Sequence, residues 1–81
     1  MRFGEILLEF LSQKNMTQDQ LARELEVSST LVNRWINKKD IAPSINRCRE
    51  IAKILKLTRE EENKLIEASV EERLPDEFRF L

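Results

Sequence analysis

The side chains with the most informative chemistry lie between Ser28 and Arg34, a short polar stretch interleaved with apolar residues at helical spacing. The polar side of the helix expected there consists of Ser29, Thr30, Asn33 and Arg34. Their hydroxyl, amide and guanidinium groups are the donors and acceptors that contact base edges in the major groove of DNA. A solvated helix face would more often carry Glu and Lys. These four residues are therefore predicted to contact DNA bases.

The sequence lacks the residues that metal binding, nucleophilic catalysis and phosphate-binding loops usually require. The sequence has no histidine and one cysteine, Cys48, so it offers neither a common zinc ligand set nor a Cys–His or Ser–His nucleophile pair. Its one glycine, Gly4, cannot form a glycine-rich phosphate loop. We therefore expect no enzymatic activity, no cofactor, no metal and no small-molecule substrate.

Two short helices are predicted to hold the polar stretch in place. The first begins after Thr17, whose hydroxyl stands at capping-box spacing from Gln20. The second begins after a cap at Ser28 or Ser29. Their apolar faces are Leu21, Ala22 and Leu25 in the first helix, and Leu31, Val32, Trp35 and Ile36 in the second. Because so few residues separate them, the helices must cross steeply and touch, with the small Ala22 at the crossing.

This pattern resembles the lambda-repressor-like (XRE-type) helix-turn-helix family of phage repressors and bacterial regulators. The resemblance covers roughly residues 2–57, and its most specific pieces are Met16-Thr17-Gln18, Leu21-Ala22, Val32, Arg34-Trp35, Pro43-Ser44-Ile45 and Ile51-Ala52. It implies an all-α, five-helix domain whose second short helix enters the major groove of double-stranded DNA. We assign residues 1–74 to this DNA-binding domain and residues 75–81 to an apolar C-terminal tail, a candidate dimer contact.

The sequence departs from the family pattern at two turns. The family usually has glycine at the turn between the two helices, where this chain has Glu26, and again after the recognition helix, where it has Lys38. Left-handed backbone costs a residue other than glycine about 1 kcal/mol. At the second turn, Asn37 is the candidate for the left-handed position.

Contacts to the DNA backbone are expected from residues around the recognition helix. Thr17 and Gln18 lie at the positive end of a helix, where phosphate binds readily. Two lysines follow the recognition helix, and a cap at Ser44 opens the next helix. The predicted backbone contacts are Thr17, Gln18, Asn37, Lys38, Lys39, Ser44 and Arg47.

Charge is distributed unevenly along the chain, whose net charge is −1. Residues 28–57 carry seven Lys and Arg against two Asp and Glu, whereas residues 58–81 carry four against eight. Attraction to phosphate is screened beyond about 8 Å in physiological salt, so a local basic segment can bind DNA although the whole chain is slightly acidic.

Three further helices are expected around the central pair. The first covers residues 2–14, and the last begins at a second capping box, Thr58 with Glu61. The helix after Ser44 should face inward with Ile45, Cys48, Ile51, Ala52 and Leu55. Cys48 on that face is interpreted as a small buried hydrophobic residue.

Length and composition limit the remaining alternatives. The chain suffices for one small domain, and its longest apolar run, Ile6 to Leu8, is too short to span a membrane. No signal peptide is apparent, and a single cysteine fits a reducing, cytoplasmic location. We expect a DNA-binding transcription regulator, most simply a repressor, that acts as a homodimer. The alternative is a protein–protein interaction module or an antitoxin-type autoregulator in which DNA contact is secondary.

Overall fold

The computed structural model describes residues 3–37 and 42–73. The described chain forms five α-helices and no strand: α1 (Phe3–Gln13), α2 (Gln18–Leu25), α3 (Ser29–Ile36), α4 (Ile45–Leu55) and α5 (Arg59–Arg73). The five-helix, all-α prediction is thereby confirmed. None of these helices is both long and apolar enough to cross a membrane. The predicted contacts Lys38 and Lys39 and the tail of residues 75–81 lie outside the described residues.

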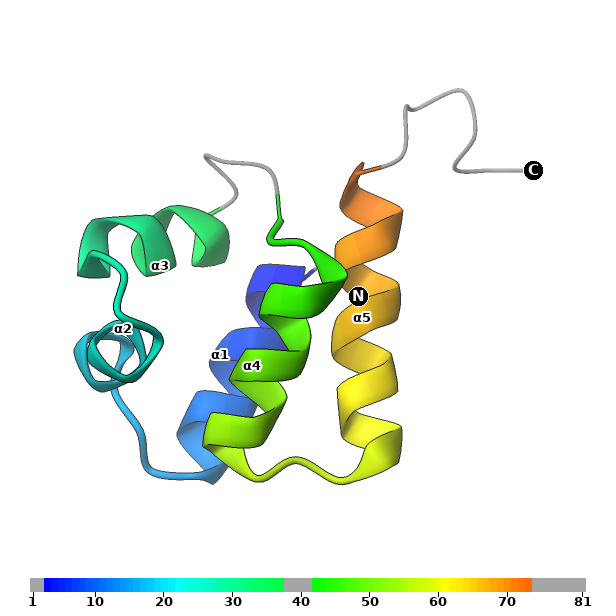
Figure 1. Cartoon of the computed structure of the whole chain (residues 1–81), viewed down its shortest axis with the longest axis horizontal. Helices are drawn as coiled ribbons and strands as arrows, with labels where there is room; N and C mark the ends of the chain where they lie inside the picture. The colour runs from blue at the N-terminus through cyan, green and yellow to red at the C-terminus, as the bar shows by residue number, and fades with distance from the viewer. Residues whose placement is uncertain (1–2, 38–41, 74–81) are drawn as a thin grey trace.

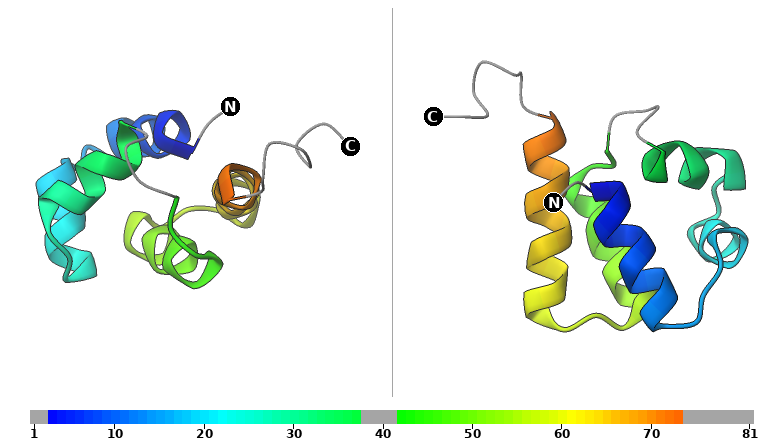
Figure 2. Two further views of the ribbon diagram at one scale, coloured as in Figure 1. Left: turned by 90° about the horizontal axis from the view of Figure 1, so that it is seen from above. Right: turned by 180° about the vertical axis from the view of Figure 1, so that it is seen from behind.

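The helices form two groups in space (Figures 1 and 2). Helix α5 packs against both α1 and α4, and these three helices form one group. The pair α2 and α3 lies on the side of the molecule away from α5, where α3 packs on α1 and α2 packs on α4. One outer surface of α3 is thus left uncovered by the other described helices.

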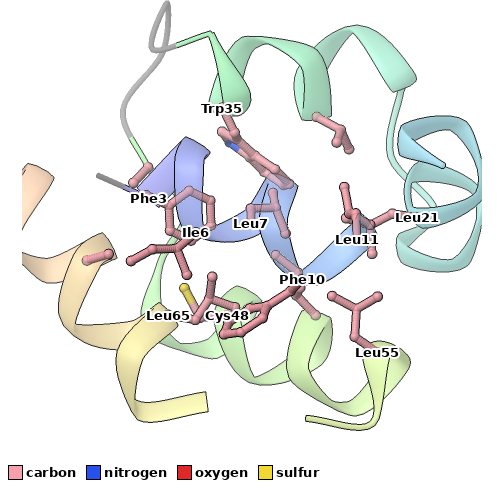
Figure 3. Close-up of a cluster of buried hydrophobic side chains, with 14 of the residues drawn as sticks. Phe3, Ile6, Leu7, Phe10, Leu11, Leu21, Trp35, Cys48, Leu55 and Leu65 are labelled. Carbon is pink, nitrogen blue, oxygen red and sulfur yellow. The ribbon is translucent and has the colours of Figure 1, made fainter. Parts of the chain in front are cut away.

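One hydrophobic core joins all five helices. Figure 3 shows Trp35 reaching from α3 toward Leu7 of α1. Trp35 is only 5% exposed, which confirms its predicted place on the inward apolar face of this helix. The fully buried side chains larger than alanine are Phe3, Leu7, Leu21, Val32, Cys48, Ile51, Leu55, Leu65 and Ser69. The inward position predicted for Ile45 is wrong: it is 36% exposed, because α4 reaches the core only one turn later, at Cys48.

Capping residues begin the helices where the sequence predicts them. Thr17 accepts the backbone N–H of Gln20 at 3.1 Å, and the Gln20 side chain accepts the Thr17 N–H at 2.8 Å, a complete capping box. Thr58 and Glu61 make the same pair of bonds at 3.2 and 2.9 Å. The bond from the Thr58 N–H lowers the pKa of the Glu61 carboxyl from its usual value.

Three helices end in the same backbone turn, with a residue other than glycine in the left-handed conformation. These residues are Asn15, Glu26 and Lys56, with φ of 55°, 59° and 54°. The residue that follows each of them donates its N–H back to a carbonyl in the last helical turn: Met16 to Leu11 at 2.9 Å, Val27 to Ala22 at 3.0 Å, and Leu57 to Ala52 at 2.9 Å. These are the bonds of a Schellman motif, and an apolar residue stands at both ends of each one. Glu26 therefore adopts the geometry that glycine usually provides.

The end of α3 differs from the prediction. Asn37 caps this helix with φ −92° and ψ 7°, so the left-handed position expected for it is wrong. Its backbone N–H instead donates to the Asn33 carbonyl at 2.9 Å, which closes the helix with an ordinary helical bond. Asn37 therefore has no positive φ that glycine would relieve, and Lys38, which stands where the family usually has glycine, lies outside the described residues.

Gly4 permits the close approach of α1 to the end of α3. A Cβ atom at this position would lie 2.9 Å from both the Cα and the carbonyl carbon of Ile36, and still nearer to its carbonyl oxygen. These are backbone atoms, which cannot move aside as a flexible side chain would. The one glycine of the chain is therefore a contact point between the two helices, although its φ is not positive.

A buried polar cluster attaches the start of α4 to α5. The carbonyl oxygen of Pro43 accepts the hydroxyl of Ser69, and the Cys48 thiol also donates to it at 3.8 Å. Burial raises the pKa of the Cys48 thiol above its ordinary value. Cys48 is fully buried, as the sequence predicts.

Gly4→Ala should destabilise the domain, although alanine is ordinarily the better helix former. The added methyl group overpacks the Ile36 backbone, so unfolding should become easier by about 1–3 kcal/mol. For a domain of this size, that lowers the Tm by several degrees. Thermal unfolding followed by circular dichroism measures the change, with Ser12→Ala, at an exposed position of the same helix, as the control. A Tm equal to or above that of the wild type would contradict the contact.

Glycine should stabilise the turns at Glu26 and Lys56. Relief of the left-handed strain gains about 1–2 kcal/mol, and the greater freedom of the unfolded chain offsets about 0.4–1 kcal/mol of it. Both Glu26→Gly and Lys56→Gly should therefore raise the Tm. Asn15→Gly is the matched control and should change it less, because asparagine tolerates this conformation better. Equal effects at all three positions would argue against strain as the cause.

Candidate nucleic-acid interface

Helix α3 divides sharply into a buried side and an exposed side. Val32 and Trp35 are buried in the core. The residues predicted to contact bases, Ser29, Thr30, Asn33 and Arg34, are all exposed. Because the apolar side is held by packing, the polar side is presented to solvent in a defined orientation.

Helix α2 supports α3 from beneath. In Figure 1, α2 is seen nearly end-on while α3 lies across the view, so the two helices cross steeply. They pack against each other, and Ala22 in α2 is only 2% exposed. The Schellman turn at Glu26 changes the direction of the chain between them within three residues, Glu26 to Ser28. The predicted pair of short, steeply crossed helices is confirmed.

Three of the predicted DNA-contact residues form a chain of side-chain amides. Asn33 Nδ2 donates to Gln18 Oε1 at 3.2 Å, which joins the exposed side of α3 to the first residue of α2. Asn37 Nδ2 donates to Asn33 Oδ1 and to the Asn33 carbonyl oxygen, at 3.0 Å in each case. The structure thus brings Gln18, Asn33 and Asn37 together.

The starts of α2 and α4 carry hydroxyl caps suited to phosphate. Thr17 Oγ1 accepts one backbone N–H, and Ser44 Oγ accepts the N–H of Arg47 at 3.3 Å, so each hydroxyl keeps a hydrogen to donate. The first turn of α4 lies at the same end of the molecule as α3 (Figure 1). Helix N-termini also bring partial positive charge to bound anions.

Arg47, in the first turn of α4, is held only loosely by its neighbour. Its guanidinium lies 3.6 Å from a carboxylate oxygen of Glu50, and both side chains are substantially exposed. An ion pair of this kind contributes little to stability, so the guanidinium can exchange Glu50 for another anion.

The most acidic helix, α5, is remote from α3. Helix α5 contains six glutamates against three basic residues, and it lies on the opposite side from α2 and α3 in Figures 1 and 2. Helix α4 has the reverse balance, with three basic residues against one glutamate. Repulsion between α5 and a polyanion bound at α3 is thereby reduced by distance and screening.

Sequence reasoning missed the two side-chain contacts of Asn33 that position this surface. The hydrogen bond between Gln18 and Asn33 joins residues 15 positions apart, and no local sequence pattern predicts it. Asn33 and Asn37 are four residues apart, which makes them neighbours on one helix face, so their contact could have been predicted from the sequence. The backbone contact at Gly4 has only the rarity of glycine as its signal in the sequence.

Comparison with known proteins agrees with this geometry. A family model described as Helix-turn-helix matches residues 7–61, which include all of α2, α3 and α4. The chain is also 36% identical over 61 residues to the HTH-type transcriptional activator BcrR of Enterococcus faecalis. That alignment covers 75% of this chain and 29% of the relative, so the chain spans less than a third of that protein's length. No solved structure matched the chain.

The family match covers well over half of the chain and includes the crossed pair α2 and α3. Proteins of this type regulate transcription by binding DNA and are generally not enzymes. The chain therefore belongs to the lambda-repressor-like helix-turn-helix family of DNA-binding transcription regulators.

Proposed function

We propose that this protein binds double-stranded DNA in a sequence-specific manner by inserting α3 into the major groove. The observation that carries the proposal is the exposed polar side of a short helix whose other side is fixed in the core by Val32 and Trp35. Readout of base edges requires such rigid presentation, because hydrogen bonds to bases tolerate little misplacement. The proposed base contacts are Ser29, Thr30, Asn33 and Arg34.

Phosphate contacts on both sides of α3 would fix its register on the duplex. The hydroxyl caps of α2 and α4 and the exchangeable guanidinium of Arg47 support this arrangement. The proposed backbone contacts are Thr17, Gln18, Lys38, Lys39, Ser44 and Arg47. Asn37 was predicted with them from its position, but its amide nitrogen already has two acceptors within the protein.

Repression by occupancy of an operator is the proposed regulatory outcome. A bound domain excludes other proteins from the DNA that it covers, and this requires no further activity of the chain. The relative from Enterococcus faecalis is named an activator, and it is much longer than this chain. The sign of regulation in that protein therefore does not carry over to this one.

A homodimer is proposed as the DNA-binding form. One recognition helix covers only a few base pairs, whereas two copies joined by a two-fold axis cover two half-sites. The sequence after α5 contains Leu74, Phe78, Phe80 and Leu81, a concentration of apolar residues that a dimer contact would use. In this division, residues 1–74 form the DNA-binding domain and residues 75–81 the dimer contact.

Arg34→Ala should weaken binding to the preferred site by about 1–3 kcal/mol and relax the preference at one base pair. Its binding to random-sequence DNA should change much less. Fluorescence anisotropy with the two DNAs at several salt concentrations gives both values. Lys53→Ala, the same loss of charge in the last turn of α4, is the control and should leave both affinities near those of the wild type.

A second comparison separates base readers from phosphate contacts. Lys39→Ala should weaken all sequences alike and reduce the slope of log affinity against log salt by about one. If Arg34→Ala behaved in this way instead, its role as a base reader would be wrong. If the wild type bound no DNA at either low or moderate salt, the interaction-module alternative would replace the proposed function.

The dimer should depend on the apolar residues of the C-terminal segment. The combined substitution of Phe78→Ser with Phe80→Ser should convert a dimer to a monomer in sedimentation equilibrium and leave the Tm unchanged. Leu8→Ser is the matched control, because Leu8 is a surface leucine that is 48% exposed on α1. A wild-type chain that stays monomeric at high micromolar concentration would exclude this contact.

A further inference from the structure

The side-chain hydrogen bonds of the amide chain through Asn33 all donate in the same direction along it. Asn37 donates to the Asn33 oxygen, and the Asn33 nitrogen donates to the Gln18 oxygen. Asn37 also donates to the backbone carbonyl of Asn33, so its amide nitrogen is tied to the helix itself. Because an amide nitrogen can only donate, Asn37 determines which end of the Asn33 amide faces it.

These bonds leave a specific pair of groups on Asn33. An amide side chain has two donor hydrogens and two acceptor lone pairs. Among the residues that the structure describes, Gln18 takes one hydrogen and Asn37 takes one lone pair. One N–H and one lone pair remain, and adenine presents the complementary pair at N7 and N6 in the major groove.

We propose that the amide chain fixes Asn33 as a reader of adenine, with Asn37 as a positioning residue that does not itself contact DNA. The inference rests on the proposed function, in which the exposed side of α3 faces the bases. If the Asn33 amide rotated by half a turn, its nitrogen would face the Asn37 nitrogen and its oxygen would face the Gln18 oxygen. The Gln18 amide could turn as well and relieve the second pair. The Asn37 nitrogen cannot, because it also donates to the Asn33 carbonyl, so Asn37 holds the orientation suited to adenine.

The same chain assigns a role to Gln18. Its oxygen accepts from Asn33, so its nitrogen retains two hydrogens at the start of α2, where a phosphate oxygen is the natural acceptor. A phosphate contact at Gln18 and a base contact at Asn33 are then joined by one hydrogen bond. Loss of Asn37 should therefore disturb base choice more than it disturbs attraction to the DNA backbone.

The experiment begins with sites selected by the intact wild-type protein from a random duplex pool. At the base pair read by Asn33, the wild type should prefer adenine over each other base by about 5- to 150-fold, the range for a bidentate contact. Asn33→Ala identifies that base pair, because the preference should vanish there and persist at the other positions. Absence of any selected sequence would count against the proposed function itself.

Asn37→Ala tests the positioning role at the same base pair. The preference for adenine should fall to a few-fold, while affinity for random DNA and its salt dependence stay near those of the wild type. Asn37→Leu, which is similar in shape but lacks the donor, should behave in the same way. Adding Asn37→Ala to Asn33→Ala should cause no further loss of discrimination, since Asn37 acts only through Asn33. Asn63→Ala, an exposed asparagine in α5, is the matched control.

A measurement without DNA checks the positioning directly. In the free protein, Asn37→Ala should shift the side-chain amide resonances of Asn33 and Gln18 in an NMR spectrum, and Asn63→Ala should leave them in place. The inference is overturned if Asn37→Ala weakens all sequences equally and lowers the salt slope, which is the signature of a direct phosphate contact. It is also overturned if Asn33→Ala leaves every base preference intact although the wild type selects a defined site.

Discussion

The packing of α3 onto α1 is the contact on which the rest of the structure depends. A helix of eight residues has little stability in water, so it exists here because Trp35 and Val32 are buried and because its last turn rests against Gly4. The contact is made by backbone at Ile36 and by the large side chain of Trp35 beside it, and Val32 is buried one turn earlier. Together these fix both the distance of α3 from the core and its rotation about its own axis.

Stability and DNA contact are consequently supplied by different sides of the same helix. The polar residues of α3 are exposed and lie outside the core, so contact with another molecule at this surface would not disturb the packing. The Schellman turns and hydroxyl caps also keep these two roles separate, because they satisfy the backbone groups at helix ends locally. The amide chain joins the side chains of Gln18, Asn33 and Asn37 on the exposed surface by hydrogen bonds. Without these bonds, the three side chains would rotate freely.

Local chemistry explains which features could be predicted from the sequence. Capping residues at Thr17, Ser28, Ser44 and Thr58 set the starts of four helices, since each cap acts within three residues of itself. Periodicity identified Trp35 as a core residue for the same reason. Ile45 was misplaced because periodicity gives a direction around a helix and not how far the core extends along it. The approach of Gly4 to Ile36 and the bond from Asn33 to Gln18 depend on how distant segments meet, which spacing alone does not contain.

The separation of the acidic helix α5 from α3 has a consequence for how the protein meets DNA. With a net charge of −1, the molecule as a whole gains almost nothing from long-range attraction. Its acidic helix α5 and its basic helix α4 nevertheless make the electrostatic potential uneven over the surface, and a charged duplex responds to that unevenness before contact. An approach over α5 would be opposed by its six glutamates, and an approach from the other side of the molecule, where α3 lies, would be opposed less. The charge distribution would therefore select the angle of approach rather than increase the number of collisions.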